Sequence, residues 1–480
     1  MAQNIELLNQ NLTALKDISA GIRKFLTKLL DEYSFVETDV FLSGDNLVYD
    51  KAPLGEGVVT GYATIDGNPV YIVAQNAEAL NGSFGKAHAE KLLKNINRAI
   101  KNGLPLISII DSTGLRIGEG IAALDGYSKV IAAARRLMQH ASHIVVVKGP
   151  AVGLMAVYAT TSDFIFMASS DGKASEKGNG PSLSLGAPMV ISAKATQSKK
   201  GSEIVGAQFH ATKSGLVAAS YKNEKELRAS IISVFEYLDG VHIDNKDDPN
   251  RVSLNLNKEI KPEALLSAIV DDGKYVELYK EWTSSVRTVL ASVNSIPVGI
   301  VLTNANGSSP KIGRDGIKKI KKFIDVLSKY KLSLVNLVDC EGIIDNLDAE
   351  QSGILSDIND LFLAVIDSDK ITKISVVTGS AIGAAYALLV SKSTGYDFVV
   401  AFSSAKISAI SAEVAAGTLY LNQLNGAKDP IKARIELEEK YKLEESNPFI
   451  AAKDGSVDNI IEAGLLRPYI ASALTMAQEA

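Results

Sequence analysis

Short apolar runs rich in β-branched residues alternate along the first half of the chain with longer stretches of helical periodicity. The runs are residues 70–73, 106–110, 144–147 and 164–167. Because they lack polar alternation, they predict strands that are buried on both faces. Residues 87–100 and 122–139 carry apolar positions three or four apart and predict amphipathic helices. Strands that alternate with helices of this length indicate right-handed crossovers and a largely parallel sheet.

The second half of the chain shows the same alternation. Its apolar runs are residues 298–303, 334–339, 374–377 and 398–401, and a basic helix is predicted over 313–331. Residues 262–292 are interpreted as helical, and the Gly/Ser/Lys-rich stretch 169–180 as a surface loop. We therefore expect an α/β protein with two domains, 1–255 and 296–480, joined by a helical connector over 256–295.

Three blocks of sequence occur twice, in the same order and at nearly one spacing. IVVVKGPAVG, ending at Gly153, aligns without gaps on ISVVTGSAIG, ending at Gly383. LISIID, ending at Asp111, matches LVNLVD, ending at Asp339. DFIF at 163–166 matches DFVV at 397–400. Three ordered matches predict a duplicated unit of about domain size.

The first repeated block suggests where chemistry occurs. In both copies a buried strand ends, the chain turns through Gly-Pro or Gly-Ser, and a helix opens around Gly153 or Gly383. The first N–H groups of a helix have no intrahelical partner, and they can stabilise negative charge that develops on a nearby oxygen. Glycine at this position permits the close approach of a carbonyl group. Such turns are also common packing solutions, so a structural role stays open for each alone. Their duplication favours two sites for two carbonyl groups.

Composition narrows the classes of function. The chain has 480 residues, a net charge of -5 and one cysteine, Cys340, which is interpreted as a core residue. The acidic balance gives no basic surface for nucleic acid, and one cysteine excludes a disulfide framework. Five histidines without ligand spacing predict no metal site. Neither the amphipathic start nor the turn-interrupted stretch 374–391 fits a signal peptide or membrane span, so a cytoplasmic location is expected.

Short motifs in both halves resemble those of one enzyme family. They are GEGVVTGY at 55–62, GSFGKAHAEK at 82–91, DSTGLRIGEG at 111–120, GPAVG at 149–153, AQFHATKSG at 207–215, IGAAY at 382–386, NPFIAA at 447–452 and VDNIIE at 457–462. In order and spacing they are similar to the carboxyltransferase components of biotin-dependent acyl-CoA carboxylases and decarboxylases, such as the propionyl-CoA carboxylase β subunit and the acyl-CoA decarboxylase α subunit. The resemblance covers about residues 50–470.

The resemblance implies a fold and a mechanism. The fold is two tandem crotonase-like domains, of the ClpP/crotonase superfamily. Carboxybiotin on a separate carrier protein meets a short acyl-CoA thioester at a dimer interface, and no metal takes part. The family's oxyanion hole for the thioester falls at Gly153 and the N–H of Leu154. Its hole for biotin falls at Gly383, Ala384 and Ala385. The freed biotin nitrogen takes the α-proton, so no side-chain base is required.

The same resemblance places further residues near the substrates. They are Gly82, Ser83, His88, Lys91, Gly114, Arg116, Tyr386 and Ala387. His88 and Lys91 follow a Gly-rich turn where coenzyme A phosphates or adenine dock; a structural histidine and a solvated lysine are the alternative. Arg116 either binds a phosphate or pairs with Glu119. The lysines of the second basic helix, Lys318, Lys319, Lys321 and Lys322, are predicted to cover its outer face.

Two departures from the family pattern leave the acyl group and the direction of transfer open. Leu154 stands where the family has a second glycine, and Ala387 stands where many carboxylases have an aspartate. The sequence shows no Ala-Met-Lys-Met biotinylation site and no ATP-binding segment, so the expected partners are a biotin carboxyl carrier protein and a biotin carboxylase or membrane decarboxylase subunit. A homodimer or hexamer is expected.

Two other functions remain as alternatives. The first is a crotonase-type hydratase or isomerase, which needs a positioned carboxylate such as Glu119 or Asp111. The second is a non-catalytic assembly subunit, which Leu154 and Ala387 support.

Overall fold

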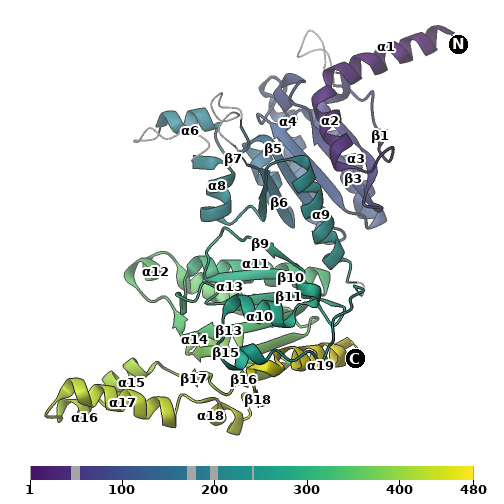
Figure 1. Ribbon diagram of the computed structural model, residues 1–480. Coiled ribbons are helices and arrows are strands. Elements are labelled where there is room, and N and C mark those ends of the chain that lie inside the picture. The colour runs from purple at the N-terminus through teal and green to yellow at the C-terminus, as the bar shows by residue number, and fades with distance from the viewer. Residues whose placement is uncertain (1, 45–53, 170–179, 195–203, 241–242, 479–480) are drawn as a thin grey trace. The chain divides into compact units, whose positions relative to one another are not determined.

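The computed structural model describes residues 2–44, 54–169, 180–194, 204–240 and 243–478. Nearly all of the surface loop predicted at 169–180 lies outside the described residues. The chain divides into two compact units, Met1–Ile232 and Ser233–Ala480, each with its own sheet (Figure 1).

The described strands of the first unit form one sheet with the order β1-β2-β3-β4-β5-β6-β8, and β7 pairs with β5. The strands are β1 (Val36–Thr38), β2 (Val58–Ile65), β3 (Asn68–Gln75), β4 (Leu106–Ser112), β5 (His143–Val152), β6 (Phe164–Ala168), β7 (Ser182–Ser184) and β8 (Ala219–Tyr221). The pairs β1–β2 and β2–β3 are antiparallel, and the remaining pairs are parallel. The parallel strands are buried on both faces, as their continuous apolar runs predict.

The second unit repeats this topology strand for strand. Its order is β9-β10-β11-β13-β15-β16-β18, and β17 pairs with β15. The strands are β9 (Tyr275–Leu278), β10 (Val286–Val293), β11 (Ile296–Thr303), β13 (Ser333–Cys340), β15 (Lys373–Ile382), β16 (Phe398–Phe402), β17 (Lys406–Ser408) and β18 (Asn459–Ile461). The first two pairs are again antiparallel and the others parallel. The duplication predicted from three sequence blocks is thus present in the fold.

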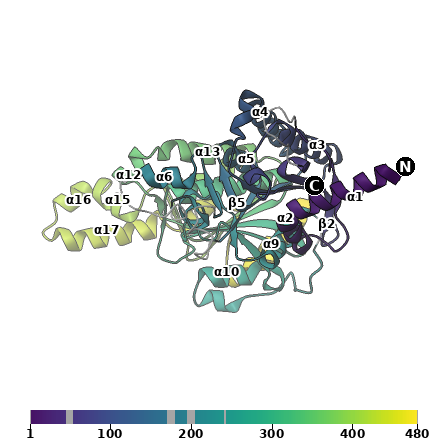
Figure 2. The same cartoon turned by 90° about the horizontal axis from the view of Figure 1, so that it is seen from above.

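Helices cover both faces of each sheet. In the first unit α3 (Lys86–Asn102) and α4 (Gly120–Leu137) pack side by side over one face. The helix α2 (Ala20–Leu29) and the first part of α9 (Glu224–Leu238), within which the division between the units falls, lie on the other (Figure 2). In the second unit α11 (Arg314–Tyr330) and α13 (Ile354–Asp367) occupy the equivalent first position. There α10 (Pro262–Ile269) and α19 (Leu466–Gln478) share a core with the opposite face of the sheet.

Further helices and short strands complete the two units. They are α1 (Ala2–Ile18), α5 (Leu154–Thr160), α6 (Pro188–Lys194), α8 (Ala207–Phe209), β12 (Lys311–Ile312), β14 (Gly342–Ile343), α12 (Leu347–Gln351), α14 (Ala384–Leu389), α15 (Ala412–Thr418), α16 (Leu421–Asn425), α17 (Pro430–Glu444) and α18 (Pro448–Lys453). Helices α15, α16 and α17 pack against one another away from the sheet (Figures 1 and 2).

The observed boundaries differ from those predicted. The division falls at 232/233, and the predicted connector 256–295 contains α10 together with β9 and β10. This segment belongs to the second sheet because β10 forms a hairpin with β11 over the full length of both strands. The apolar run of β10 is therefore a buried strand, and it follows only one short helix.

Candidate functional site

A sharp turn joins β5 to α5 in the first unit. Gly153 precedes the helix with φ 67° and ψ -133°, a conformation that side chains with a Cβ rarely adopt. The nearest atom to a Cβ built there is Leu185 O at 3.9 Å. The glycine is therefore needed for backbone shape, and the space on its Cβ side is open.

The second unit builds the same turn between β15 and α14. Gly383 has φ 57° and ψ -126°, which is close to the geometry of Gly153. A Cβ at Gly383 would lie 3.3 Å from Ala409 O, so this copy is tighter. Two units that differ in most residues have kept one unusual backbone conformation at the ends of equivalent strands.

The backbone amides of the two turns fall into two groups. The N–H of Gly153 donates to Ser184 O (2.8 Å), and that of Gly383 donates to Ser408 O (3.0 Å). These bonds attach each turn to the neighbouring strand, β7 or β17. Within the described part of the chain, no acceptor is recorded for the next two amides of either helix, those of Leu154 and Met155 and of Ala384 and Ala385. The free donors therefore begin one residue after each glycine.

In each unit an aspartate carboxylate lies close to the residues just before the turn. It belongs to the neighbouring parallel strand, β4 in the first unit and β13 in the second. A Cβ at Gly149 would lie 1.9 Å from Asp111 Oδ1, and one at Gly379 would lie 2.2 Å from Asp339 Oδ1. Glycine is required at both positions because the aspartate occupies the space. The Asp111 carboxylate pairs with Lys148 Nζ (2.7 Å).

Asp339 is bound differently. Its two carboxylate oxygens accept from the N–H of Ser380 (2.8 Å) and from Asn304 Nδ2 (2.7 Å). The two units thus share an aspartate at this position and differ in the groups that bind it.

The motifs predicted for the acyl-CoA side come together in the first unit. Phe84 N–H donates to Gly114 O (2.8 Å), and a Cβ at Gly114 would lie 3.1 Å from Val152 O, next to the turn. Gly82 has φ 64°, and a Cβ there would lie 2.0 Å from Asp111 O. The segments 82–84, 111–116 and 149–153 are therefore contiguous, as a shared site requires.

His88 and Lys91 lie on the inner face of α3, and both side chains are fully buried. His88 Nδ1 contacts Glu56 O (3.0 Å), and Lys91 Nζ donates to Gly55 O (3.0 Å) and Val58 O (2.6 Å). Burial lowers the pKa of His88 to about 3 and that of Lys91 to about 8. Side chains without solvent access do not meet coenzyme A, so the structure favours the structural alternative for His88. Lys91 was expected either to contact coenzyme A or to be solvated. In the structure its ammonium group instead binds buried backbone carbonyls.

Arg116 forms ion pairs and is likewise buried. Its guanidinium pairs with Glu56 (2.6 Å) and Glu119 (2.9 Å) and donates to Ser83 O (3.0 Å). Glu119 also accepts from the N–H of Lys86 (2.6 Å), the first residue of α3. The helix start that was a candidate for phosphate binding is therefore occupied by the chain's own carboxylate, and Arg116 forms the ion pair expected as its alternative role.

Comparison with known proteins follows this geometry. The family model described as carboxyl transferase domain matches residues 20–480. The chain belongs to the carboxyl transferase family. It is 30% identical over 470 residues to the methylmalonyl-CoA carboxyltransferase 12S subunit of Propionibacterium freudenreichii subsp. shermanii, covering 95% of this chain and 88% of that one. It is also 30% identical over 471 residues to the methylmalonyl-CoA decarboxylase subunit alpha of Veillonella parvula, covering 95% and 89%.

A solved structure of transcarboxylase 12S, a hexamer with methylmalonyl-coenzyme A and methylmalonic acid bound, matches with a TM-score of 0.90 at 26% identity, covering 99% of this chain and 94% of that one. The expected family, the fold of two tandem crotonase-like domains and the class of enzyme, a biotin-dependent acyl-CoA carboxyltransferase, are confirmed.

The residues at which this carboxyl transferase departs from its family have clear positions. Leu154 is partly buried and packs against the core of the first unit, and its amide has no acceptor among the described residues. Tyr386 and Ala387 lie in the first turns of α14, both partly buried. Ala387 N–H donates to Gly383 O (3.4 Å), so this residue closes the first turn of the helix.

Sequence reasoning missed two residues that shape these turns. Ser184 and Ser408 supply the carbonyls that hold the two glycine amides. Beside the first turn, His210 of the motif at 207–215 holds Leu183 O of β7 through Nε2 (2.8 Å). The signal for such carbonyl contacts is weak because backbone groups of any residue type can provide them.

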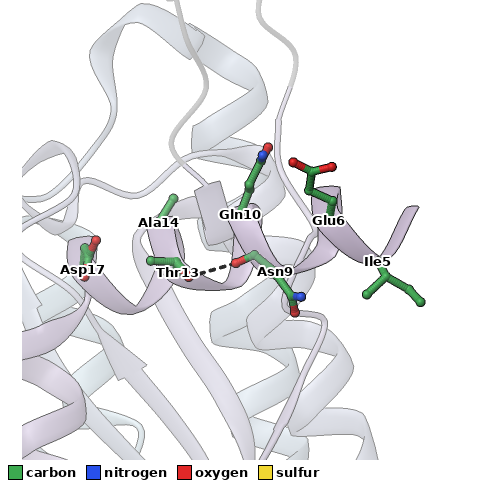
Figure 3. A pocket seen from close by; sticks show the side chains of 7 residues that line it. All are labelled: Ile5, Glu6, Asn9, Gln10, Thr13, Ala14 and Asp17. Carbon is green, nitrogen blue, oxygen red and sulfur yellow. Dashed lines mark hydrogen bonds between the residues drawn. The ribbon is translucent and has the colours of Figure 1, made fainter. Parts of the chain in front are cut away.

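Other features of the described chain add no chemistry to the site. A shallow depression runs along α1 (Figure 3) and is lined by Ile5, Glu6, Asn9, Gln10, Thr13, Ala14 and Asp17. None of the residues predicted for the site lines it. Across the described residues, no three His, Cys, Asp or Glu side chains gather as metal ligands do, and no helix has the length and apolar character to cross a membrane.

Proposed function

We propose that the chain transfers a carboxyl group between carboxybiotin, carried by a separate protein, and a short acyl-CoA. One observation supports this proposal above the others: each unit places a glycine of the same rare conformation before a helix whose next two amides have no acceptor among the described residues. A reaction with two carbonyl groups that gain negative charge needs two such sets of donors. The bound methylmalonyl-coenzyme A in the similar transcarboxylase structure supports an acyl-CoA substrate.

The first unit is proposed to hold the thioester. When the α-proton leaves, the thioester oxygen becomes enolate-like and accepts from the N–H of Leu154, and the N–H of Met155 is a second donor at the same turn. Gly153 contributes shape and open space, since its own N–H is bonded to Ser184. The neighbouring residues Gly82, Ser83 and Gly114 line the approach.

The second unit is proposed to hold biotin. Its ureido oxygen gains charge when the bond between biotin nitrogen and carboxyl carbon breaks, and the amides of Ala384 and Ala385 are placed to stabilise it. The nitrogen then takes the α-proton of the acyl group, and the enolate carbon attacks the released carbon dioxide. Gly383 again sets the turn. Tyr386 and Ala387 are the nearest candidates for contacts that choose between acyl groups.

The assembly follows from this assignment. We propose that the thioester turn of one subunit faces the biotin turn of another, in a homodimer or a hexamer of such dimers. The transcarboxylase 12S relative is a hexamer in a multienzyme core, which supports an assembly of this kind. A biotin carboxyl carrier protein, with a biotin carboxylase or a membrane decarboxylase subunit, completes the reaction. The single, buried, free cysteine supports a cytoplasmic location.

The hydratase or isomerase alternative has little support from side-chain geometry. Its candidate bases are engaged, Glu119 by Arg116 and Lys86 N–H and Asp111 by Lys148. To reach the α-carbon of an acyl-CoA, either carboxylate would have to break these ion pairs.

The test uses the purified full chain, methylmalonyl-CoA labelled in its free carboxyl group, and free biotin. We expect label to pass to biotin with this substrate, or with malonyl-CoA or glutaconyl-CoA in the same assay. Transfer from none of the three contradicts the proposal and leaves the assembly-subunit alternative. Hydration of crotonyl-CoA without transfer supports the hydratase instead.

A further inference from the structure

A buried glutamine lies directly beneath the thioester-side turn. Gln75 ends β3, and only 2% of its surface is exposed. Its amide nitrogen lies 3.6 Å from Met155 Sδ, the second residue of α5, and its amide oxygen accepts from the N–H of Asp111 (3.2 Å). One side chain therefore joins the ends of β3 and β4 to the first turn of α5.

The orientation of this amide is set by His88. The imidazole Nδ1 lies 3.0 Å from Glu56 O, and because a carbonyl only accepts, Nδ1 carries the proton. Nε2 is then an acceptor, and Gln75 Nε2 lies 3.3 Å from it. The amide nitrogen thus points to His88 and Met155, and the amide oxygen points to Asp111. Neither His88 nor Met155 has any exposed surface.

The second unit lacks this chain of contacts. Thr303 occupies the position equivalent to Gln75 when Asp111 is aligned on Asp339. Among the described residues, its hydroxyl exchanges hydrogen bonds with the backbone of Asp339 alone. In the same alignment the residue equivalent to His88 is Gly316, where a Cβ would lie 2.7 Å from Ile312. The arrangement is therefore not a requirement of the duplicated fold. It belongs to the unit that we assign to the thioester.

We propose that Gln75, oriented by His88, is a positioning residue for carboxyl transfer, holding Met155 so that the amides of Leu154 and Met155 point to one place. This inference rests on the proposed function of the turn. Donors that stabilise a developing oxyanion work because they are fixed before charge appears, and small displacements cost large factors in rate. Gln75 itself has no access to substrate, so its effect passes through α5.

The first test compares two buried polar side chains of the first unit. Gln75→Met keeps the volume and removes the amide. Asn95→Leu is the matched control, since Asn95 is fully buried on α3 and donates to Gly61 O (3.1 Å) and Ile72 O (2.6 Å) without a recorded contact to α5 among the described residues. Labelled transfer from methylmalonyl-CoA to free biotin gives kcat and KM, and amide hydrogen exchange is followed for the peptide 153–157.

We expect Gln75→Met to lower kcat at least tenfold, to change KM for methylmalonyl-CoA less than twofold, and to speed exchange in 153–157. Asn95→Leu should lower the melting temperature and leave kcat and that exchange unchanged. Equal kcat in the two variants, or faster exchange in neither, overturns the inference. If the wild type transfers no label, the proposed function fails, and the exchange comparison still decides whether Gln75 holds the turn.

A second pair of variants tests the role of His88 separately. His88→Gln presents an acceptor where Nε2 was and loses the bond to Glu56 O. His88→Asn keeps a donor where Nδ1 was and loses the acceptor for Gln75. Positioning through Gln75 predicts that His88→Gln retains most of kcat and that His88→Asn loses it as Gln75→Met does. Equal kcat in both contradicts the relay through Nε2.

Discussion

His88 shows how burial changes the behaviour of a titratable residue. Its imidazole is enclosed by Phe84, Gln75 and the backbone of Glu56, and burial lowers its pKa to about 3, with the charges of Arg116 and Lys91 adding to the effect. In the unfolded chain the pKa is about 6.5. Between these values the unfolded state binds the proton and the folded state does not. Stability is therefore lost as pH falls through this window.

The neutral, buried imidazole of His88 should make the protein less stable at acidic pH. Between pH 7.5 and pH 5 the His88 imidazole should cost the wild type about 2 kcal/mol of unfolding free energy, and His88→Gln removes this contribution. Urea denaturation of both proteins at the two pH values measures it, because the other titrations cancel in the difference. If the difference between variant and wild type is the same at both pH values, His88 does not fold in its neutral form.

The spacing of residues along α3 indicated that His88 is buried, although histidine and lysine are polar residue types. His88 and Lys91 share the inward stripe of α3 with Leu92 and Ile96. Lys319 is the counterpart of Lys91 in the second copy and is also fully buried, with Nζ bonded to Trp282 O (2.9 Å) and Val286 O (2.7 Å).

The prediction that Lys319 covers an outer face was wrong, because the lysine binds carbonyls at the start of a strand. The charge of a lysine favours the outer face of a helix, whereas the position of Lys319 in the repeat favours the inner face. Aligning the two copies would have marked both lysines as inward, since one residue type recurs on the apolar stripe of both helices.

At the scale of elements, a buried ion pair ties the loop before β2 to the turn after β4. Glu56 has no exposed surface and its partner Arg116 is 3% exposed. Taking two charges out of water costs free energy, which their pairing offsets.

Arg116→Met should therefore destabilise the protein by about 3–5 kcal/mol, because it leaves Glu56 uncompensated. The double variant Glu56→Gln/Arg116→Met should recover part of this loss. Thermal and urea unfolding measure both effects, and KM for acyl-CoA in the surviving folded protein should change little. A large rise in KM for acyl-CoA in Arg116→Met, with normal stability, would instead indicate that Arg116 binds a phosphate.

Element prediction succeeded where a strand was a continuous apolar run and failed where it belonged to a hairpin. The strands β3, β4 and β6 and their counterparts were predicted within two residues at each end. The strands β5 and β15 continue five residues beyond the predicted runs, through Gly149-Pro150 and Gly379-Ser380, where a turn was expected. The partners β2 and β10 were missed, although Asp66-Gly67 and Asn294-Ser295 form two-residue turns with positive φ, a recognisable hairpin signal. Missing β10 moved the predicted domain boundary into the second unit.

At the scale of the whole molecule, the duplication explains why one chain carries two different sites. The two sheets have the same strand order, and each places a glycine turn after its fifth strand. The surrounding groups have diverged: Lys148 faces Asp111 in one unit, and Asn304 with Ser380 N–H faces Asp339 in the other. The sequence predicted the turns because they are duplicated. It did not predict which amides are free, because acceptors such as Ser184 O lie on strands without a motif.

The most direct measurement removes one backbone donor and nothing else. Ala384 is exposed and is the first residue of α14, a position where proline fits a helix and supplies no N–H. Ala384→Ser is the control, since it keeps the amide. If this amide stabilises the biotin oxygen, Ala384→Pro should transfer label from methylmalonyl-CoA to free biotin about 100- to 1000-fold more slowly than Ala384→Ser, with the fold retained by circular dichroism. Equal rates in the two folded variants would contradict carboxyl transfer through these backbone amides.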